Sequence, residues 1–276
     1  MSQENKTAII SIGGGMRSAY GAGFLYALKT MLGIPHADII VASSGGTGNA
    51  LYFITGQSEA AEHVWGELLP TPRFISWTRR PIMDIDYLVD DVLKNRFPLR
   101  TDLLAESKTE YFVPLLDVKT GEVRYVGRED GVDPYELLRA SKSMPFFFGK
   151  AVSLLGHSYM DGGIALTAHD MVEYAIQKGA KRILVIDNRT RLTFGKRLIL
   201  LIYERLLATR ATQKAIRHWT AHHGKAPRVG DAQCVVIHPE LPIWPATKNP
   251  RKIRAIFQMG IADALARAQE LRTLFA

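Results

Sequence analysis

Residues 7–18 read TAIISIGGGMRS, and this stretch sets the architecture of the chain. Thr7–Ile12 is a short apolar run rich in isoleucine, which is typical of a buried β-strand. Three glycines follow, and a helical pattern then continues to about Leu32, where Gly33 suits a helix C-terminus. Strand, tight turn and helix in this order predict the first half of a parallel β-α-β unit.

A second strand and helix repeat this order. Asp38–Ala42 (DIIVA) predicts a buried strand, Ser43–Gly48 turns the chain, and the next helix ends near Gly56. Because strand-helix-strand-helix order implies parallel strands and right-handed crossovers, we expect an α/β fold with a mostly parallel sheet. Further strands are predicted at Tyr111–Val118, Glu122–Gly127, Lys150–Leu154, His157–Met160, Arg182–Asp187 and Cys234–His238. Further helices are predicted at Ser58–Leu69, Ile85–Lys94, Pro134–Ala140, Ala168–Lys178, Leu192–His222 and Arg251–Leu274.

Length and composition limit the class of protein. The chain has 276 residues, 47% hydrophobic and 22% charged, and no linker or repeat divides it, so we expect a single domain over residues 1–276. The N-terminus lacks the pattern of a secretory signal, and no apolar run approaches the length of about 20 residues that a transmembrane helix needs. We therefore expect a cytoplasmic protein. Its single cysteine, Cys234, excludes an internal disulfide.

The turn Ala42-Ser43-Ser44-Gly45-Gly46 lies where a predicted strand passes into a helix. A nucleophile elbow needs this setting, because small residues must flank the serine and a helix N-terminus favours a developing negative charge. The serine at the centre of the G-x-S-x-G pattern is Ser44, with Ala42 in place of the first glycine. A serine- and glycine-rich helix cap without chemistry has the same sequence, so this motif alone leaves both interpretations open.

The glycines at positions 13, 14 and 15 leave backbone N–H groups uncovered by side chains, and such groups bind an oxyanion or another anion. A dinucleotide-binding turn requires a glycine where Ser18 stands and an acid after the next strand, and a P-loop requires Gly-Lys-Ser/Thr. Neither pattern is present. The loop is therefore read as an oxyanion site or as a tight connection, with a nucleotide site disfavoured.

Asp161-Gly162-Gly163 follows a predicted hairpin strand and precedes a helix. An aspartate beside two glycines can approach another backbone closely, which would bring its carboxylate within reach of Ser44 as a general base. An ordinary Asp-Gly turn is the alternative, because this pair is common in turns.

These three motifs, in this order, resemble the patatin-like phospholipase family. A fourth block agrees with them: residues 140–148 (ASKSMPFFF) are similar to the family's A-S-x-A-x-P-x-x-F segment, with Ser143 in place of its second alanine. The resemblance covers about Thr7 to Ala180. It implies a three-layer α/β/α sandwich with a catalytic core at residues 7–180, and we expect residues 181–276 to extend the same sheet and helices.

The resemblance also implies a chemistry, which is the hydrolysis of acyl esters of lipids without a metal or other cofactor. Ser44 would be the nucleophile and Asp161 the base of a Ser–Asp dyad that uses no histidine. Two residues depart from the family pattern close to the dyad, Ala42 and Ser18. The implied oxyanion hole consists of the amides of Gly13, Gly14 and Gly15. The supporting residues are Arg17, Gly45, Gly46, Gly162 and Gly163.

Positive charge is concentrated in one part of the chain. Between Arg189 and Arg228 there are ten Lys or Arg and one acid, Glu204, so this block carries +9 and the rest of the chain, whose net charge is +8 in total, is close to neutral. The block suits an anionic partner, so we expect peripheral contact with an anionic membrane surface through residues 189–228, with Leu192–Leu207 guiding an anionic lipid. A solvated helical face, or a core helix with a charged edge, is the alternative.

Two other functions compete with a lipid hydrolase. The first is a catalytically weak or inactive acyl- or lipid-binding protein on the same scaffold. The second is a nucleic-acid or nucleotide binder, which is not expected because the chain has no such motif and no aromatic-rich stacking platform. His238, which closes the last predicted strand, is the candidate for a Ser–Asp–His triad in place of the dyad.

Overall fold

The computed structural model describes residues 5–144, 147–189, 209–222, 227–239 and 243–276. Within them, eight strands form one sheet in the order β5-β6-β3-β2-β1-β7-β8, and β4 pairs with β3 beside this path. The strands are β1 (Lys6–Ile12), β2 (Ile39–Ala42), β3 (Glu110–Asp117), β4 (Val123–Gly127), β5 (Val152–Leu154), β6 (His157–Asp161), β7 (Ala180–Asp187) and β8 (Gln233–Ile237).

The middle of this sheet is parallel. β3, β2, β1, β7 and β8 pair side by side in the same direction, whereas β4, β5 and β6 pair antiparallel at one side. β7 and β8 therefore continue the parallel sheet beyond β1. Residues Thr7–Ile12 of β1 are all buried, as expected for a strand of a parallel sheet that is covered on both faces.

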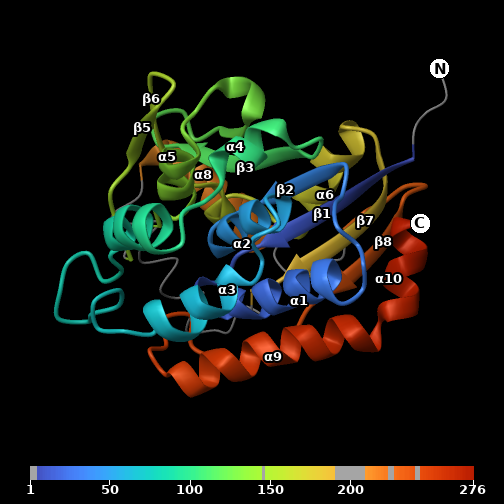
Figure 1. The fold of residues 1–276 in the computed structure, drawn as a ribbon. Helices are drawn as coiled ribbons and strands as arrows, with labels where there is room; N and C mark the ends of the chain where they lie inside the picture. The colour runs from blue at the N-terminus through green and yellow to red at the C-terminus, as the bar shows by residue number, and fades with distance from the viewer. Residues whose placement is uncertain (1–4, 145–146, 190–208, 223–226, 240–242) are drawn as a thin grey trace.

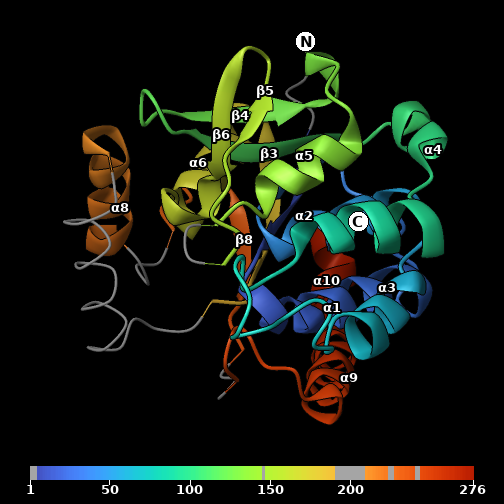
Figure 2. The ribbon, with the colours of Figure 1, turned by 90° about the vertical axis from the view of Figure 1, so that its left-hand side faces the viewer.

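Helices cover both faces of the sheet (Figures 1 and 2). Ile9 of β1 packs into a core that includes residues of α1, α2 and α9. Its neighbours Ala8 and Ile10 pack into a second core with Met171 and Val172 of α6, because successive side chains of a strand point to opposite faces. The predicted three-layer α/β/α sandwich with a mostly parallel sheet is confirmed.

The helices fall into three kinds. The α-helices are α1 (Ser18–Thr30), α2 (Gly45–Ile54), α3 (Ala60–His63), α4 (Thr101–Glu106), α5 (Pro134–Ser141), α6 (Ala168–Gln177), α8 (Arg210–His222), α9 (Pro250–Ala266) and α10 (Ala268–Phe275). The 3-10 turns are η1 (Gly15–Arg17), η4 (Arg128–Asp130) and η5 (Gly162–Ile164), and the wider π-helices are η2 (Val64–Leu68) and η3 (Tyr87–Arg96). Among the described residues, none of these helices has the length and apolarity to cross a bilayer.

Helices α1 and α9 cross with their backbones in close contact. A Cβ on Gly23 of α1 would lie 2.0 Å from the carbonyl oxygen of Phe257, and a Cβ on Gly260 of α9 would lie 2.1 Å from that of Tyr20. Each helix therefore contributes a glycine where the other helix presents its backbone. The C-terminal α9 is in this way fixed to the helix that starts directly after the glycine loop.

The structure differs from the predicted elements in three places. Ser58–Leu69 is a short α3 followed by a π-helix, and the predicted last helix ends at Ala266 before α10 begins. Helix α4 is not among the predicted elements. Of the predicted helix Leu192–His222, the structure describes α8; Leu192–Leu207 lies outside the described residues.

Candidate active site

Two neighbouring strand ends bring the glycine loop and the serine turn together. β1 ends at Ile12 and β2 at Ala42, and Ser11 is in register with Ala42. Because parallel strands end at the same edge of the sheet, the turns that follow them meet there. A Cβ on Gly13 would lie 2.4 Å from the Cβ of Ser44. The glycine loop is therefore in contact with the serine.

Ser44 has the backbone conformation of a sharp strand-to-helix turn. Its φ and ψ angles are 54° and −131°, and a positive φ is uncommon for a residue with a side chain. Such strained residues cluster at functional sites. Ala42 does not share this conformation, since Ser44 and Leu155 are the non-glycine residues with positive φ among those described. The alanine therefore fits the position of the elbow glycine without backbone strain.

Gly45 and Ser18 fill complementary space beside this turn. Ser18, the first residue of α1, is fully buried, and its hydroxyl has no hydrogen-bond partner among the described residues. A Cβ on Gly45 would lie 2.5 Å from the Ser18 Oγ. The side chain at position 18 thus occupies the space that a side chain at position 45 would need. Gly46 is equally confined, because its Cβ would lie 2.2 Å from the carbonyl oxygen of Ser11.

The glycine loop presents unpaired N–H groups. Within the described part of the chain, no carbonyl accepts a hydrogen bond from the N–H of Gly14 or Gly15, whereas Met16 donates to the carbonyl oxygen of Pro245 at 2.8 Å. Gly15 has a φ of 62° and begins the η1 turn, where the first N–H groups have no partner within the helix. The loop therefore meets the requirement for an anion site, which is backbone donors left open.

Asp161 ends β6 and carries the carboxylate of the site. It is 1% exposed and accepts a hydrogen bond from the N–H of Gly163 at 2.8 Å, and the Ser44 side chain is among the groups that lower the pKa of its carboxyl group. The Asp161 N–H donates to the carbonyl oxygen of Ser143 at 3.0 Å. Gly162 lets the chain pass close to β3, since its Cβ would lie 2.5 Å from the carbonyl oxygen of Pro114.

The environment of Asp161 tunes its proton affinity. Burial raises the pKa of its carboxyl group to about 6, while the hydrogen bonds of Gly163 and Ser44 and the nearby positive charges of Lys142 and Arg189 lower it. The carboxylate is consequently ionised at pH 7 and has a pKa close to that pH. A general base near neutral pH has this property.

Lys142 is a functional candidate that the motifs do not single out. It is buried in the segment that also supplies Ser143, and among the described residues its ammonium group makes two long hydrogen bonds, 3.4 Å each, to the Leu138 carbonyl oxygen and the Ser141 Oγ. Burial lowers the pKa of Lys142 to about 7, and the charge of Asp161 opposes this shift. The sequence signal is a lysine within ASKSMPFFF, a block that has no other charged residue.

Two arginines line the pocket together with the glycine loop. Arg17 is 6% exposed and its Nε donates to the carbonyl oxygen of Gly14 at 3.2 Å, which holds the loop from inside. Burial lowers the pKa of Arg17 to about 10, and the charge of Asp187 opposes this. Arg189 forms a buried ion pair with Asp187 at 2.9 Å. The first cation of the basic block 189–228 is therefore paired with a carboxylate within the protein and does not add to its surface charge.

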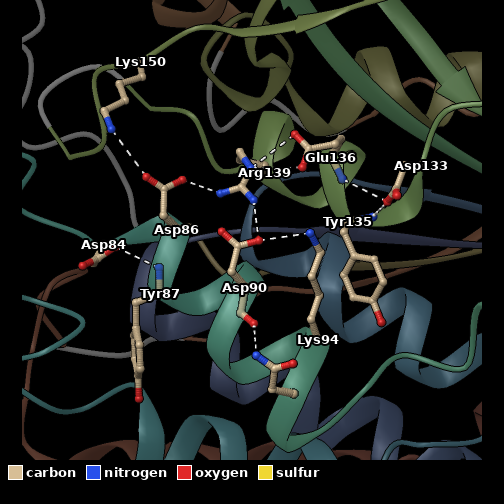
Figure 3. A network of polar contacts seen from close by, with 11 residues as sticks. Asp84, Asp86, Tyr87, Asp90, Lys94, Asp133, Tyr135, Glu136, Arg139 and Lys150 are labelled. Atoms are coloured by element: carbon tan, nitrogen blue, oxygen red, sulfur yellow. Dashed lines mark hydrogen bonds and ion pairs between the residues drawn. The ribbon is translucent and has the colours of Figure 1, made fainter.

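An ion-pair network connects α5, which leads into Lys142, to η3 (Figure 3). Arg139 of α5 pairs with Asp86, with Asp90 at 2.8 Å and with Glu136 at 3.3 Å, and its side chain is 13% exposed. Because one guanidinium bridges carboxylates of both helices, it fixes α5 relative to η3. This network positions the pocket wall that η3 forms.

Ser44, Asp161, the glycine loop and Lys142 line one pocket with a volume of about 500 Å3. The rest of its wall is mainly apolar and includes side chains from the two π-helices, Trp65 of η2 and Leu88 and Leu93 of η3. A pocket with a few convergent polar groups in an apolar wall is the usual form of a small-molecule site. Of the fourth sequence block, Met144 and Phe147 also line it.

His238 lies elsewhere. It lines a different cavity, together with Tyr20 and Asp263, and it is not among the residues that surround Ser44. The described residues thus give the serine an aspartate as its neighbour and offer no support for a triad through His238. In the same part of the chain, no three His, Cys, Asp or Glu side chains gather as metal ligands would.

These features define a class of protein, an α/β/α sandwich in which a serine at a strand-to-helix turn faces a buried aspartate in an apolar pocket. The family model named Patatin-like phospholipase matches residues 12–172, which is more than half of the chain. The protein belongs to this family. The matched span contains the glycine loop, the serine turn, the ASKSMPFFF block and Asp161.

Two individual proteins are similar to the chain. It is 28% identical over 198 residues to the uncharacterized protein YjjU of Escherichia coli (strain K12), a match that covers 67% of this chain and 52% of YjjU. The chain thus spans about half the length of that relative. Among solved structures, it is similar to VipD from Legionella pneumophila, with a TM-score of 0.47 and 12% identity, over 94% of this chain and 67% of VipD.

Proposed function

We propose that the protein is a serine hydrolase that cleaves acyl esters of lipids, with Ser44 as nucleophile and Asp161 as general base. Membership of the patatin-like phospholipase family supports lipid acyl hydrolysis at the level of the family. The observation that carries the proposal for this chain is that Ser44 and the buried Asp161 line the same pocket beside the glycine loop, with Ser44 among the groups that lower the pKa of Asp161.

The proposed reaction has two steps. Asp161 takes the proton of the Ser44 hydroxyl as its oxygen attacks the ester carbonyl, and the tetrahedral oxyanion is held by the amides of Gly13, Gly14 and Gly15. The ester carbon–oxygen bond then breaks, the alcohol leaves with the proton, and an acyl-serine remains. Water, deprotonated by the same Asp161, hydrolyses this acyl-serine and restores the serine.

The pocket wall supports a lipid as the substrate. Its apolar side chains favour an acyl chain, because apolar surface is removed from water when the chain enters. Contact of residues 189–228 with an anionic membrane, a cytoplasmic location and a single folding unit over residues 1–276 remain predictions from the sequence.

A fluorophosphonate probe tests the proposal, because it reacts with an activated serine and forms a stable covalent adduct. We expect the wild-type protein to be labelled and the Ser44→Ala variant not to be labelled. The matched control is Ser43→Ala, which removes the neighbouring buried hydroxyl, one without a hydrogen-bond partner among the described residues. This variant is expected to label like the wild type.

Two outcomes would count against the proposal. Wild-type protein that is folded but not labelled would indicate a lipid-binding protein without catalysis on this scaffold. Labelling that persists in Ser44→Ala and disappears in Ser43→Ala would show that Ser43, and not Ser44, is the nucleophile.

The pH dependence of ester hydrolysis tests the role of Lys142. Below about pH 6 the Asp161 carboxylate becomes protonated and the rate is expected to fall. The charge of Lys142 lowers the pKa of Asp161, so Lys142→Met should raise that pKa and move the acid limb of kcat/KM to higher pH. The measurement is a pH–rate profile with a soluble short-chain ester.

The exposed Lys150 provides the control for this profile. Its ammonium group lies 3.4 Å from Asp86 and it does not line the pocket, so Lys150→Met should leave the acid limb where it is. An acid limb that stays in place or moves to lower pH in Lys142→Met would contradict the assignment of Lys142 as a charge partner of Asp161.

A further inference from the structure

All four tryptophans of the chain line the active-site pocket, although they come from four different segments. They are Trp65, Trp77, Trp219 and Trp244. Trp65 lies inside and is 7% exposed, whereas Trp77 and Trp244 are 49% and 54% exposed. These two are the most exposed large hydrophobic side chains among the described residues. The pocket therefore runs from Ser44 to a mouth that carries two solvent-exposed indole rings.

Positive charge accompanies both exposed tryptophans. The segment 70–83, around Trp77, contains three arginines and no acid, and the segment 243–262, which begins next to Trp244, contains four Lys or Arg and no acid. In Figure 1 the loop that follows α3 and the segment that leads into α9 lie at the same end of the molecule. The cations of the two segments are Arg73, Arg79, Arg80, Lys248, Arg251, Lys252 and Arg254.

Most of these cations are not neutralised by the protein. Arg79 lies 3.7 Å from Asp84 and Arg254 lies 3.8 Å from Glu67. Within the described ranges, Arg80, Lys248 and Arg251 have no acidic partner and are exposed. Exposed tryptophans that share their segments with uncompensated cations fit a partner that is apolar inside and anionic at its surface.

We propose that the mouth of the pocket is a docking surface for a lipid bilayer with anionic headgroups, into which Trp77 and Trp244 insert. Indole rings favour the boundary between lipid and water, because one edge is apolar and the N–H remains hydrogen-bonded. Lysine and arginine near a negatively charged leaflet are attracted to it. This surface differs from the basic block 189–228 that the sequence points to.

Docking at this surface would deliver a lipid acyl chain to Ser44, an inference that rests on the proposed function. The pocket continues without interruption from the exposed tryptophans to Ser44. An acyl chain that leaves the bilayer at this mouth reaches the serine along an apolar wall and does not cross water. Helix α8 contributes Ile216 and Trp219 to the same pocket.

The test is sedimentation of the full chain with large unilamellar vesicles, made either of phosphatidylcholine alone or of phosphatidylcholine and phosphatidylglycerol in equal parts. The Ser44→Ala protein is used throughout, so that lipid is not consumed and binding is measured without turnover. We expect preferential binding to the anionic vesicles, weakening at high salt, and a shift of tryptophan emission to shorter wavelength when vesicles are added.

Two sets of variants locate the surface. Trp77→Ala with Trp244→Ala is expected to weaken binding to anionic vesicles by about tenfold or more. The matched control is Met31→Ala with Leu265→Ala, which removes two side chains that are 46% and 43% exposed and do not line the pocket. Lys248→Glu with Arg251→Glu should also weaken binding, and acids near the N-terminus of α9 suit the helix dipole, so the fold is kept. Melting curves check each variant.

The proposal is overturned if vesicles of both compositions bind equally, if nothing binds, or if the tryptophan pair and its control behave alike. It is also overturned if the tryptophan pair instead holds two copies of the chain together in lipid-free solution. Failure of the proposed function is detected by a different experiment. The fluorophosphonate probe would then leave the wild-type serine unlabelled, whether or not vesicles bind.

Discussion

Asp161→Asn should lower kcat/KM for ester hydrolysis by about a thousandfold or more, because an amide cannot accept the proton of Ser44 at neutral pH. The substitution changes one atom and keeps an oxygen that can accept from the Gly163 N–H, which now bonds the carboxylate at 2.8 Å. The effect is therefore expected on the chemical step. Steady-state kinetics with a soluble short-chain ester would measure it.

Although Asp161→Asn should lower activity, it should raise stability relative to wild type, and this gain should increase with pH. Burial raises the pKa of Asp161 above its ordinary value of 3.8, to about 6, so the native state favours the protonated form. The buried charge consequently costs stability as the pH rises from about 4 to 6, and the cost is fully present above pH 6. The melting temperature of Asp161→Asn minus that of the wild type should therefore be larger at pH 8 than at pH 4.

Asp117→Asn is the matched control for a buried aspartate. Its carboxylate accepts from the N–H groups of Lys119 and Thr120 and pairs with His157, and it does not line the pocket. This variant should hydrolyse the ester at about the wild-type rate. If Asp161→Asn retained the wild-type rate in a correctly folded protein, another group would have to be the base.

Gly260→Ala is expected to lower the free energy of unfolding by about 2–3 kcal/mol. The new Cβ would lie 2.1 Å from the carbonyl oxygen of Tyr20. This oxygen belongs to the backbone of α1, so one of the two helices must move. In an unhindered helix the same substitution would raise the free energy of unfolding by about 0.5–1 kcal/mol. A decrease therefore indicates a steric collision, and an increase indicates that none occurs. Urea denaturation measures the change.

Gly48→Ala in α2 supplies the unhindered control. The nearest atoms to its Cβ would be those of Leu138 and Lys142, each 4.0 Å away. We expect this variant to unfold at the same urea concentration as the wild type or at a higher one. Equal midpoints for Gly260→Ala and Gly48→Ala would show that the contact between α1 and α9 does not limit stability.

Much of the site can be predicted from the sequence because it is built from local turns. The glycine loop and Ser44 come just after a strand and Asp161 ends one, and a strand end with small residues is visible in a short stretch of sequence. The parallel pairing of β1 with β2 brings the glycine loop and Ser44 to one edge. Asp161 reaches the same edge from the antiparallel β6, because it pairs with Leu115 of β3, beyond the point where β2 ends. The fold class is predictable for the same reason, since strand and helix alternate along the chain.

The remaining features depend on contacts between distant segments. Lysine is rarely buried, and although its apolar surroundings in the sequence single out Lys142, they do not indicate that it lies close enough to Asp161 to lower that residue's pKa. Likewise, Trp77 and Trp244 are far apart in the sequence, and only the fold makes both of them line the same pocket. The break between α9 and α10 falls at Arg267, with no glycine or proline to mark it.

The fit between Ser18 and Gly45 restricts the order in which this protein can change during evolution. A methyl group at position 45 collides with the serine oxygen and lies 3.3 Å from Trp65, so it needs position 18 first reduced to glycine and a small shift of the Trp65 ring. Lineages can therefore exchange the two residues along one route, through an intermediate with glycine at both positions. Relatives with a larger residue at 45 should accordingly have lost the side chain at 18.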